Sequence, residues 1–269
     1  MKSGSRFRIG MITRWLLEES LLLVEAHGSR RIVHCPNPEA LLRYLKNRLK
    51  IDLKMHVQNL LDGNLSRADG AKAGANSKLY GARSLTGFLV NVLAPITATL
   101  DGIPWTIEPQ CGRCPFVHSF LQFTLPEDVT VVGVENAESF FQIQAQRYLF
   151  ENITPIFVLR FANSSDIVRW LQRIPNDYVH FGDFDFSGMR LYLSEFKQKL
   201  GTRARFLVPS AVEALLHSHG NRNLYDIQRQ YRPGLEMLNE PDMQQLLKWI
   251  DDAQAGLEQE IFITHRSQD

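Results

Sequence analysis

The sequence predicts an α/β protein in which a mixed N-terminal region precedes a C-terminal domain built on a parallel β-sheet. Beyond residue 126, four short apolar stretches alternate with stretches of helical length. This alternation is typical of βαβ units, with helices on both faces of a parallel sheet. The proline-containing segment 126–128 separates the regular pattern from what precedes it. We therefore expect two domains, over residues 1–125 and 126–269.

The N-terminal region is expected to contain helices followed by a hairpin. Asn37 suits the N-cap of a basic amphipathic helix that starts at Pro38, in which leucines recur at helical spacing. The predicted helices cover residues 38–50, 52–61 and 85–93, and short β-like stretches cover 103–107 and 116–124. Helices followed by a hairpin, with basic residues between them, resemble a winged-helix domain.

The C-terminal domain is expected to carry the parallel sheet, because each short apolar run is followed by a stretch with helical spacing. The predicted strands cover residues 130–134, 155–161, 178–182 and 204–208. The predicted helices cover residues 138–150, 165–174 and 187–200, and another begins at 210. From about residue 224 onward the chain is expected to be helical.

Composition excludes two classes of protein. With 44% hydrophobic, 10% aromatic and 22% charged residues, the chain resembles folded globular proteins rather than disordered ones. No apolar run reaches the roughly 18 residues that a membrane-spanning helix requires, and the N-terminus lacks the pattern of a secretory signal. Three cysteines fit a reducing compartment better than a disulfide framework, so a cytoplasmic protein is expected.

The net charge of +1 conceals two halves of opposite sign. Residues 1–120 contain 16 Lys and Arg against 9 Asp and Glu, whereas residues 121–269 contain 14 against 20. A basic half joined to an acidic half suggests that one part binds a polyanion while the other concentrates carboxylates. The alternative is chance patterning of the surface.

Three carboxylates follow two of the predicted strands. Glu135 comes directly after the strand 130–134, and Asp183 and Asp185 follow the strand 178–182. Ligands gather at the carboxyl ends of the strands of an open parallel sheet, so these side chains are expected to meet there. Three carboxylates that share a pocket need a counter-charge, which Mg²⁺ supplies. The alternative is that Asp185 only caps the following helix.

Two acidic segments resemble the glutamate and DxD motifs of Toprim domains, which occur in type II and type VI topoisomerases, primases and small nucleases. They are Val131–Asn136 and His180–Gly188. The form GDFDFSG is most similar to the topoisomerase VI A-subunit branch and, within it, to JetD, the nuclease-subunit family of Wadjet plasmid-defence systems. Gly256–Glu260 and Ala75–Leu79 resemble that family's C-terminal LEQE motif and its basic GDSK-like segment.

The resemblance implies a C-terminal Toprim domain, with a Rossmann-like parallel sheet, that cleaves DNA. Glu135, Asp183 and Asp185 would hold Mg²⁺ or Mn²⁺. Glu258 and Glu260 would support the site from a C-terminal helix, unless they lie on a solvated helix face. Metal-activated water would hydrolyse phosphodiester bonds of plasmid or phage duplex DNA. The resemblance also implies a homodimer that serves an SMC-type, condensin-like defence complex.

A basic segment that contains glycine and serine, residues 66–84, is expected to contact DNA. The candidate phosphate contacts are Arg67, Lys72, Ser77, Lys78 and Arg83. The alternative is a solvated loop. Tyr80 is the only tyrosine in this segment, and if it were a nucleophile the protein would be a transesterase similar to topoisomerase VI. A third interpretation is a non-catalytic protein that binds DNA or assembles a complex.

Two other features have competing interpretations. Cys111 and Cys114 have the spacing of zinc ligands, and His118 follows nearby. A fourth ligand would have to come from His34 or Cys35, so a loop with two free thiols is favoured. His180 precedes Asp183 and is expected to be a core histidine rather than a general base.

Overall fold

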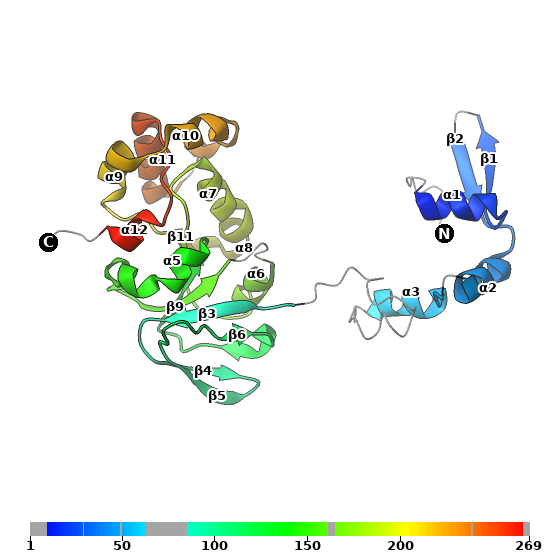
Figure 1. Cartoon of the computed structure of the whole chain (residues 1–269), viewed down its shortest axis with the longest axis horizontal. Coiled ribbons are helices and arrows are strands. Elements are labelled where there is room, and N and C mark those ends of the chain that lie inside the picture. The colour runs from blue at the N-terminus through cyan, green and yellow to red at the C-terminus, as the bar shows by residue number, and fades with distance from the viewer. Residues whose placement is uncertain are drawn as a thin grey trace. The chain divides into compact units, whose positions relative to one another are not determined.

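A computed structural model describes residues 10–28, 30–48, 50–62, 85–160, 165–237 and 239–265. The chain divides into two compact units, Met1–Ser84 and Leu85–Asp269 (Figure 1). The division therefore falls well before the expected boundary at residues 125 and 126. It differs because the strands of residues 88–124 pair with one another and with the parallel sheet, which the local sequence pattern does not show.

The first unit contains short helices and one hairpin. The elements are α1 (Met11–Glu18), β1 (Leu23–His27), β2 (Arg30–His34), α2 (Pro38–Arg48) and α3 (Leu53–Asp62). The helix predicted from Pro38 is confirmed, and Asn37 Oδ1 accepts a hydrogen bond from Ala40 N at 3.0 Å, as an N-cap does. Leu16, Leu22 and Leu45 form a small core. The hairpin of β1 and β2 was not predicted.

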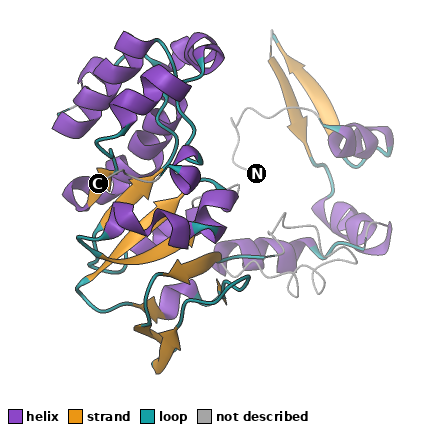
Figure 2. Cartoon of the chain, turned by 60° about the vertical axis from the view of Figure 1, so that its left-hand side comes forward, coloured by secondary structure: helices purple, strands orange, loops and turns teal. Residues whose placement is uncertain are grey.

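The second unit is built on a six-stranded mixed sheet in the order β11-β10-β8-β9-β3-β6 (Figure 2). Its four parallel strands are β8 (Val129–Val134), β9 (Thr154–Leu159), β10 (Tyr178–Phe181) and β11 (Ala204–Phe206). All four were predicted. Helices lie on both sides of this sheet in Figure 2, so the expected α/β class is confirmed.

The helix predicted over residues 85–93 is wrong. This stretch forms the strand β3 (Phe88–Val92), which pairs antiparallel with β9, and β6 (Phe116–Val117) pairs antiparallel with β3. In β3, Phe88, Val90 and Val92 are buried while the residues between them are less so. This is the period of two that a strand requires, and in so short an apolar run it is easily taken for a helix.

A three-stranded antiparallel sheet, in the order β5-β4-β7, is also part of the second unit. Its strands are β4 (Ile96–Leu100), β5 (Ile103–Ile107) and β7 (Phe123–Thr124). Asp101 and Gly102 join β4 to β5, both with positive φ, which is the geometry of a two-residue hairpin turn. The strand expected over 116–124 is broken by the turn η1 (Phe120–Gln122). Neither predicted β-stretch therefore belongs to the N-terminal unit, and the predicted winged-helix hairpin is not made of them.

The remaining helical elements follow the predicted pattern with interruptions. They are α5 (Ala137–Phe141), η2 (Ile143–Phe150), α6 (Ser165–Leu171), α7 (Phe186–Leu191), η3 (Tyr192–Lys197), α8 (Gln198–Leu200), η4 (Gly201–Arg203), α9 (Val212–His219), α10 (Arg222–Gln228), η5 (Arg229–Tyr231), η6 (Leu235–Met237), α11 (Pro241–Ala253) and α12 (Ile261–Thr264). Within the part of the chain that the structure describes, no helix combines the length and apolar character needed to cross a membrane.

Candidate active site

The candidate site lies at the carboxyl ends of β8 and β10, which are neighbours in the sheet. The chain passes from β8 to β9 on one side, and then returns to β10 on the other side of β8. A reversal of this kind opens a crevice at the strand ends, where ligands bind in α/β proteins. Val134 pairs with Phe181, and Glu135 N donates a hydrogen bond to Phe181 O at 3.1 Å. Glu135 and Asp183 therefore leave the sheet side by side.

Glu135 is held between two basic side chains. Its Oε1 lies 3.6 Å from Arg160 Nη1, and its Oε2 lies 3.7 Å from His180 Nε2. Burial by itself would raise the pKa of Glu135, but His180 and Arg160 outweigh it, so the pKa is lowered. With its side chain 19% exposed, Glu135 is an ionised carboxylate that remains accessible from solvent.

Asp183 is the carboxylate with the most perturbed acidity in this cluster. Its pKa is raised to about 7, mainly by burial and in addition by the charges of Glu135, Asp185 and Glu260, although a hydrogen bond from Gln259 opposes the shift. That bond runs from Gln259 N to Asp183 Oδ1 at 3.0 Å. Asp183 is thus crowded by like charges that a cation would neutralise.

Asp185 has the capping role that the sequence left open. It is the N-cap of α7, and its Oδ1 accepts a hydrogen bond from Gly188 N at 2.8 Å. Its Oδ2 accepts a second bond, from Gln228 Nε2 at 2.7 Å. Burial is the main cause of its raised pKa. Because a carboxylate oxygen has two lone pairs, both bonds leave capacity for a metal ion.

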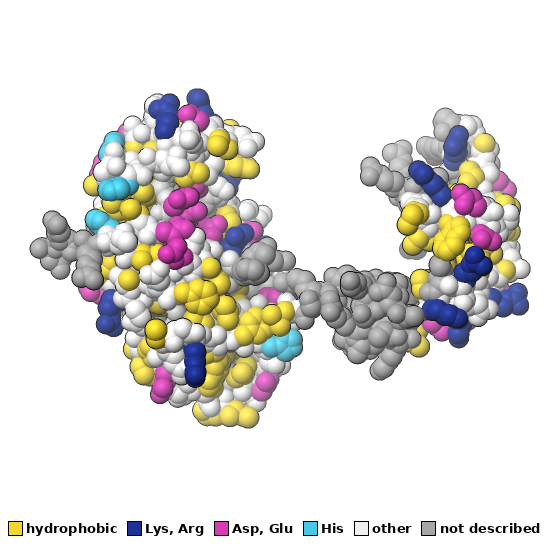
Figure 3. Space-filling view, in the orientation of Figure 1, with side chains coloured by type: hydrophobic (Ala, Val, Ile, Leu, Met, Phe, Trp, Pro, Cys, Tyr) yellow, Lys and Arg dark blue, Asp and Glu magenta, His cyan; other side chains and the backbone are white. Residues whose placement is uncertain are grey.

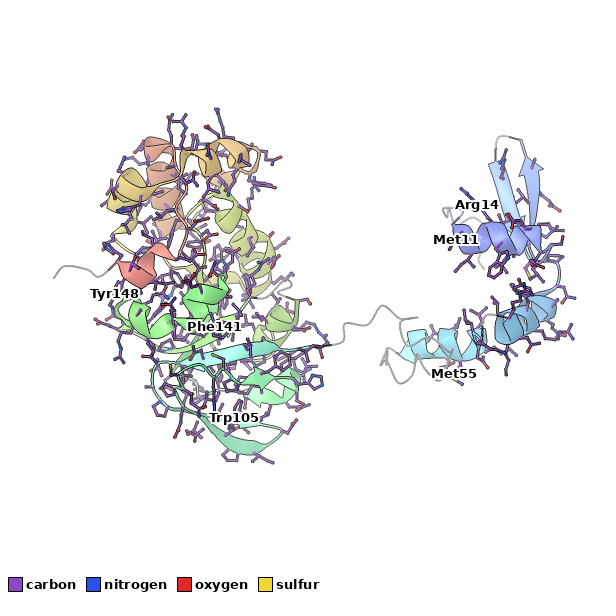
Figure 4. The ribbon with its side chains drawn as sticks, viewed as in Figure 1. Met11, Arg14, Met55, Trp105, Phe141 and Tyr148 are labelled. Carbon is purple, nitrogen blue, oxygen red and sulfur yellow. The ribbon has the colours of Figure 1, made fainter. Side chains whose placement is uncertain are left out.

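The C-terminal segment 256–260 lies against the loop that carries the two aspartates. Leu257 and Phe184 form an antiparallel bridge, with hydrogen bonds of 2.8 and 3.1 Å. The segment is a turn before α12, not the expected helix. Tyr148 holds the following residues, because its hydroxyl donates to Phe262 O at 3.1 Å and to His265 O at 2.6 Å (Figure 4). These hydrogen bonds hold α12, which is distant in sequence from Tyr148, beside the site.

The two glutamates predicted in this segment differ in position. Glu260 is partly buried, accepts a hydrogen bond from Asn136 Nδ2, and adds its charge to the field at Asp183. Glu258 is exposed, as a solvated residue would be. Between them Gln259 is fully buried, and its Oε1 accepts a hydrogen bond from Asn136 N at 3.1 Å. Sequence reasoning missed Gln259, although the resemblance at 256–260 covers it.

Four buried polar atoms around these carboxylates have no hydrogen-bond partner within the described residues. They are Gln259 Nε2 and Glu260 Oε2, together with Glu135 Oε2 and His180 Nε2, which face each other at 3.7 Å. Buried polar atoms are nearly always bonded, so such a group requires an explanation. Two of the four are carboxylate oxygens, the ligand type that Mg²⁺ prefers. The donor set therefore fits a hard divalent cation.

No three acidic, histidine or cysteine side chains among the described residues form a ready-made coordination sphere. The contacts of the site explain this arrangement, since Asp185 is turned to its cap and Glu135 toward Arg160. Mg²⁺ commonly takes only one or two protein carboxylates and completes its shell with water and substrate phosphate. Acidic side chains also gather near the middle of the face of the second unit in Figure 3.

His180 is a core residue, as expected. Its ring is fully buried, its Nδ1 lies 2.9 Å from the Tyr178 hydroxyl, and it packs against aromatic rings. These rings are Tyr192, Phe196 and Phe206, at centroid distances of 5.3 to 5.6 Å. His180 supports Glu135 from within the core.

Gly182 lies between β10 and Asp183, and its lack of a side chain lets Glu135 and His180 lie close to the backbone there. A Cβ at this position would lie 2.5 Å from Glu135 Oε2 and 2.7 Å from His180 Nε2.

Gly182→Ala is therefore expected to displace Glu135 and to weaken Mn²⁺ binding about 10- to 100-fold, as changes beside metal ligands do. Electron paramagnetic resonance of free Mn²⁺ measures this affinity. The control is Gly10→Ala, where a Cβ meets nothing within 4 Å; equal Mn²⁺ affinities in both variants would contradict the prediction.

Among the described residues, the remaining candidate ligands are not part of this cluster. Cys111 is exposed and, like Cys114, a free thiol, and His118 Nδ1 lies 3.0 Å from Thr86 O. His34 and Cys35 belong to the first unit. The basic segment with Arg67, Lys72, Ser77, Lys78, Arg83 and Tyr80 lies outside the described residues.

Comparison with known families assigns the chain. Residues 117–268 match the family described as a domain of unknown function, DUF7281, and the chain belongs to this family. The matched residues include β8, β10 and the segment 256–260, and so every carboxylate of the candidate site. No curated protein matches the chain.

Proposed function

We propose that the protein is a Mg²⁺-dependent nuclease that hydrolyses phosphodiester bonds of duplex DNA. The observation that carries the proposal is that Glu135 follows β8 and Asp183 follows the neighbouring strand β10, at the point where the strand order reverses. Buried carboxylate oxygens without partners among the described residues lie in the same place. The Toprim-like motifs, which cover these same residues, support the choice of DNA as substrate.

Some residues of the site would bind the metal ion, and others would keep these ligands ionised and in place. Glu135 and Asp183 would be ligands of Mg²⁺ or Mn²⁺, and the negative charges of Asp185 and Glu260, which raise the pKa of Asp183, would add to the attraction of the cation. When bound, the metal would activate a water molecule and stabilise charge on the attacked phosphate. Arg160 and His180 keep Glu135 ionised, and the cap on α7 keeps Asp185 in place.

The first unit would bind the DNA through its charge. Arg43, Lys46 and Arg48 occupy exposed positions of α2, where they can contact phosphates without reading sequence. The candidate phosphate contacts of residues 66–84 would add to this binding. A winged-helix-like role for the unit remains a proposal, because the predicted stretches 103–107 and 116–124 belong to the second unit.

The biological setting is proposed on the same resemblance. The protein would act as a homodimer, so that both strands are cut, and an SMC-type, condensin-like complex would bring it to plasmid or phage DNA.

The test is cleavage of a supercoiled plasmid by the purified protein. We expect nicked and linear products with Mg²⁺ or Mn²⁺ and none with EDTA. Because water is the proposed nucleophile, denatured products should carry no protein, and Tyr80→Phe should cleave at the wild-type rate. End-labelled DNA on denaturing gels, with and without protease, reports the attachment.

Two outcomes would replace the proposal. A protease-sensitive DNA adduct that disappears in Tyr80→Phe would identify a transesterase. DNA binding without cleavage under any metal would identify a non-catalytic protein that binds DNA or assembles a complex.

A further inference from the structure

Arg160 is a basic residue that the sequence motifs do not mark, yet it emerges at the acidic edge of the sheet. Leu159, the last residue of β9, pairs with Val134, the last residue of β8. Arg160 N donates a hydrogen bond to Val134 O at 2.9 Å. Arg160 therefore follows its strand next to Glu135, just as Asp183 does on the other side of β8.

Two carboxylates, those of Glu195 and Glu135, lie beside the guanidinium. Nε and Nη2 of Arg160 donate to the two oxygens of Glu195 at 3.4 and 3.3 Å, and Nη1 lies 3.6 Å from Glu135. Charge-assisted bonds of this type are usually about 2.7–2.9 Å long. The two carboxylate oxygens of Glu195 orient the guanidinium. The contact between Arg160 and Glu135 is long enough to be replaced by a closer contact with a ligand.

The element that supplies Glu195 is unusual. Between α7 and α8 the helix changes to a π-helical turn, η3, and Glu195 belongs to this turn. π-Helical turns are rare and frequently mark functional sites, because the extra residue alters which side chains face a given direction. Here the turn carries the carboxylate that holds Arg160.

We propose that Arg160 binds a non-bridging oxygen of the substrate phosphate, with Glu195 as its positioning residue. The inference deepens the proposed function and rests on it, because it defines the substrate of the acidic site as a phosphate anion. A phosphodiester beside Glu135 and Asp183 would approach a field of negative charge, which an arginine fork at the same edge offsets. Its side chain, 19% exposed, is accessible to such a ligand.

The probe is inorganic phosphate, followed by ³¹P magnetic resonance with and without Mn²⁺ bound to the full chain. Arg160→Gln should weaken phosphate binding about tenfold or more, since a charge-assisted bond is lost. Its Mn²⁺ affinity should fall much less than its phosphate affinity, because Glu135 keeps its other basic neighbour, His180. Arg160→Lys, which keeps the charge but not the fork, should weaken phosphate binding less. The control is Arg173→Gln, an exposed arginine that follows α6 on the way to β10.

The outcomes separate this inference from the proposed function. Wild-type phosphate affinity in folded Arg160→Gln, with circular dichroism unchanged, would overturn the role of Arg160 alone. If Arg160→Gln does not fold, phosphate affinity in Arg160→Lys equal to that of the wild type would overturn it equally. Failure of the wild type to bind Mn²⁺ or to cleave plasmid would instead overturn the nuclease, and phosphate titration without metal would still report on Arg160.

Discussion

Replacing Glu135 or Asp183 by alanine is expected to abolish metal-dependent DNA cleavage, with a fall in rate of about a thousandfold or more, equivalent to several kcal/mol of lost charge stabilisation. Both side chains lie at strand ends, outside the buried core, so the fold should persist. Plasmid cleavage and thermal unfolding should be measured on the same preparations.

A matched control for this experiment is Glu213→Ala, an exposed glutamate of α9. It should cleave at the wild-type rate. Wild-type cleavage by the Glu135 or the Asp183 variant would show that the carboxylates at the carboxyl ends of β8 and β10 are not the active site.

In the absence of metal at pH 8, Asp183→Asn is expected to raise the free energy of unfolding by about 1–3 kcal/mol. This is less than the free energy equivalent to the full pKa shift, because Asp183 remains partly exposed. The folded-state pKa is about 7, against an ordinary value of 3.8. Ionising Asp183 in the folded protein therefore costs free energy. The asparagine keeps the acceptor for Gln259 N and removes the charge.

The pH dependence follows from the sign of this shift. Below about pH 4 the aspartate is protonated in both the folded and the unfolded chain, so the advantage of the asparagine should vanish. It should grow between about pH 4 and pH 7, where only the unfolded chain ionises, and then level off. Denaturant unfolding at several pH values measures it, and an advantage that is constant from about pH 4 to pH 8 would contradict the shift.

Added Mn²⁺ should reverse this ranking at about pH 8. The wild type would gain stability by binding the cation, whereas Asp183→Asn would gain little. Comparison of the wild type with Asp183→Asn thus measures the repulsion among the carboxylates without metal, and its reduction when Mn²⁺ is bound.

The parallel core and the placement of Glu135 and Asp183 at the carboxyl ends of strands were predictable because they follow from the period of the apolar residues. A buried parallel strand is apolar throughout, and its carboxyl end is where the next polar residue lies. Arg160 and Gln259 were not predictable in this way. Arg160 follows the last residue of β9, and the local sequence does not distinguish it from the other basic residues. Gln259 reaches the site through the pairing of residues 184 and 257.

Errors in the first half of the chain have a related cause. Phe88–Val92 becomes a strand because it pairs with β9, which lies more than sixty residues further along the sequence. Likewise β4 is recognised only once β5 and β7 flank it. The local signal of a five-residue apolar run does not separate strand from helix.

The bridge between Phe184 and Leu257 also has a consequence for the order of folding during translation. The strands described in the second unit are all translated before residues 256–260, so a nascent chain can form its sheet and expose Glu135 and Asp183 while the segment that braces them does not yet exist. The acidic site is completed only after α11 has been made. A partly made copy of the protein consequently lacks the contact of Glu260 with Asn136 until residue 260 has left the ribosome.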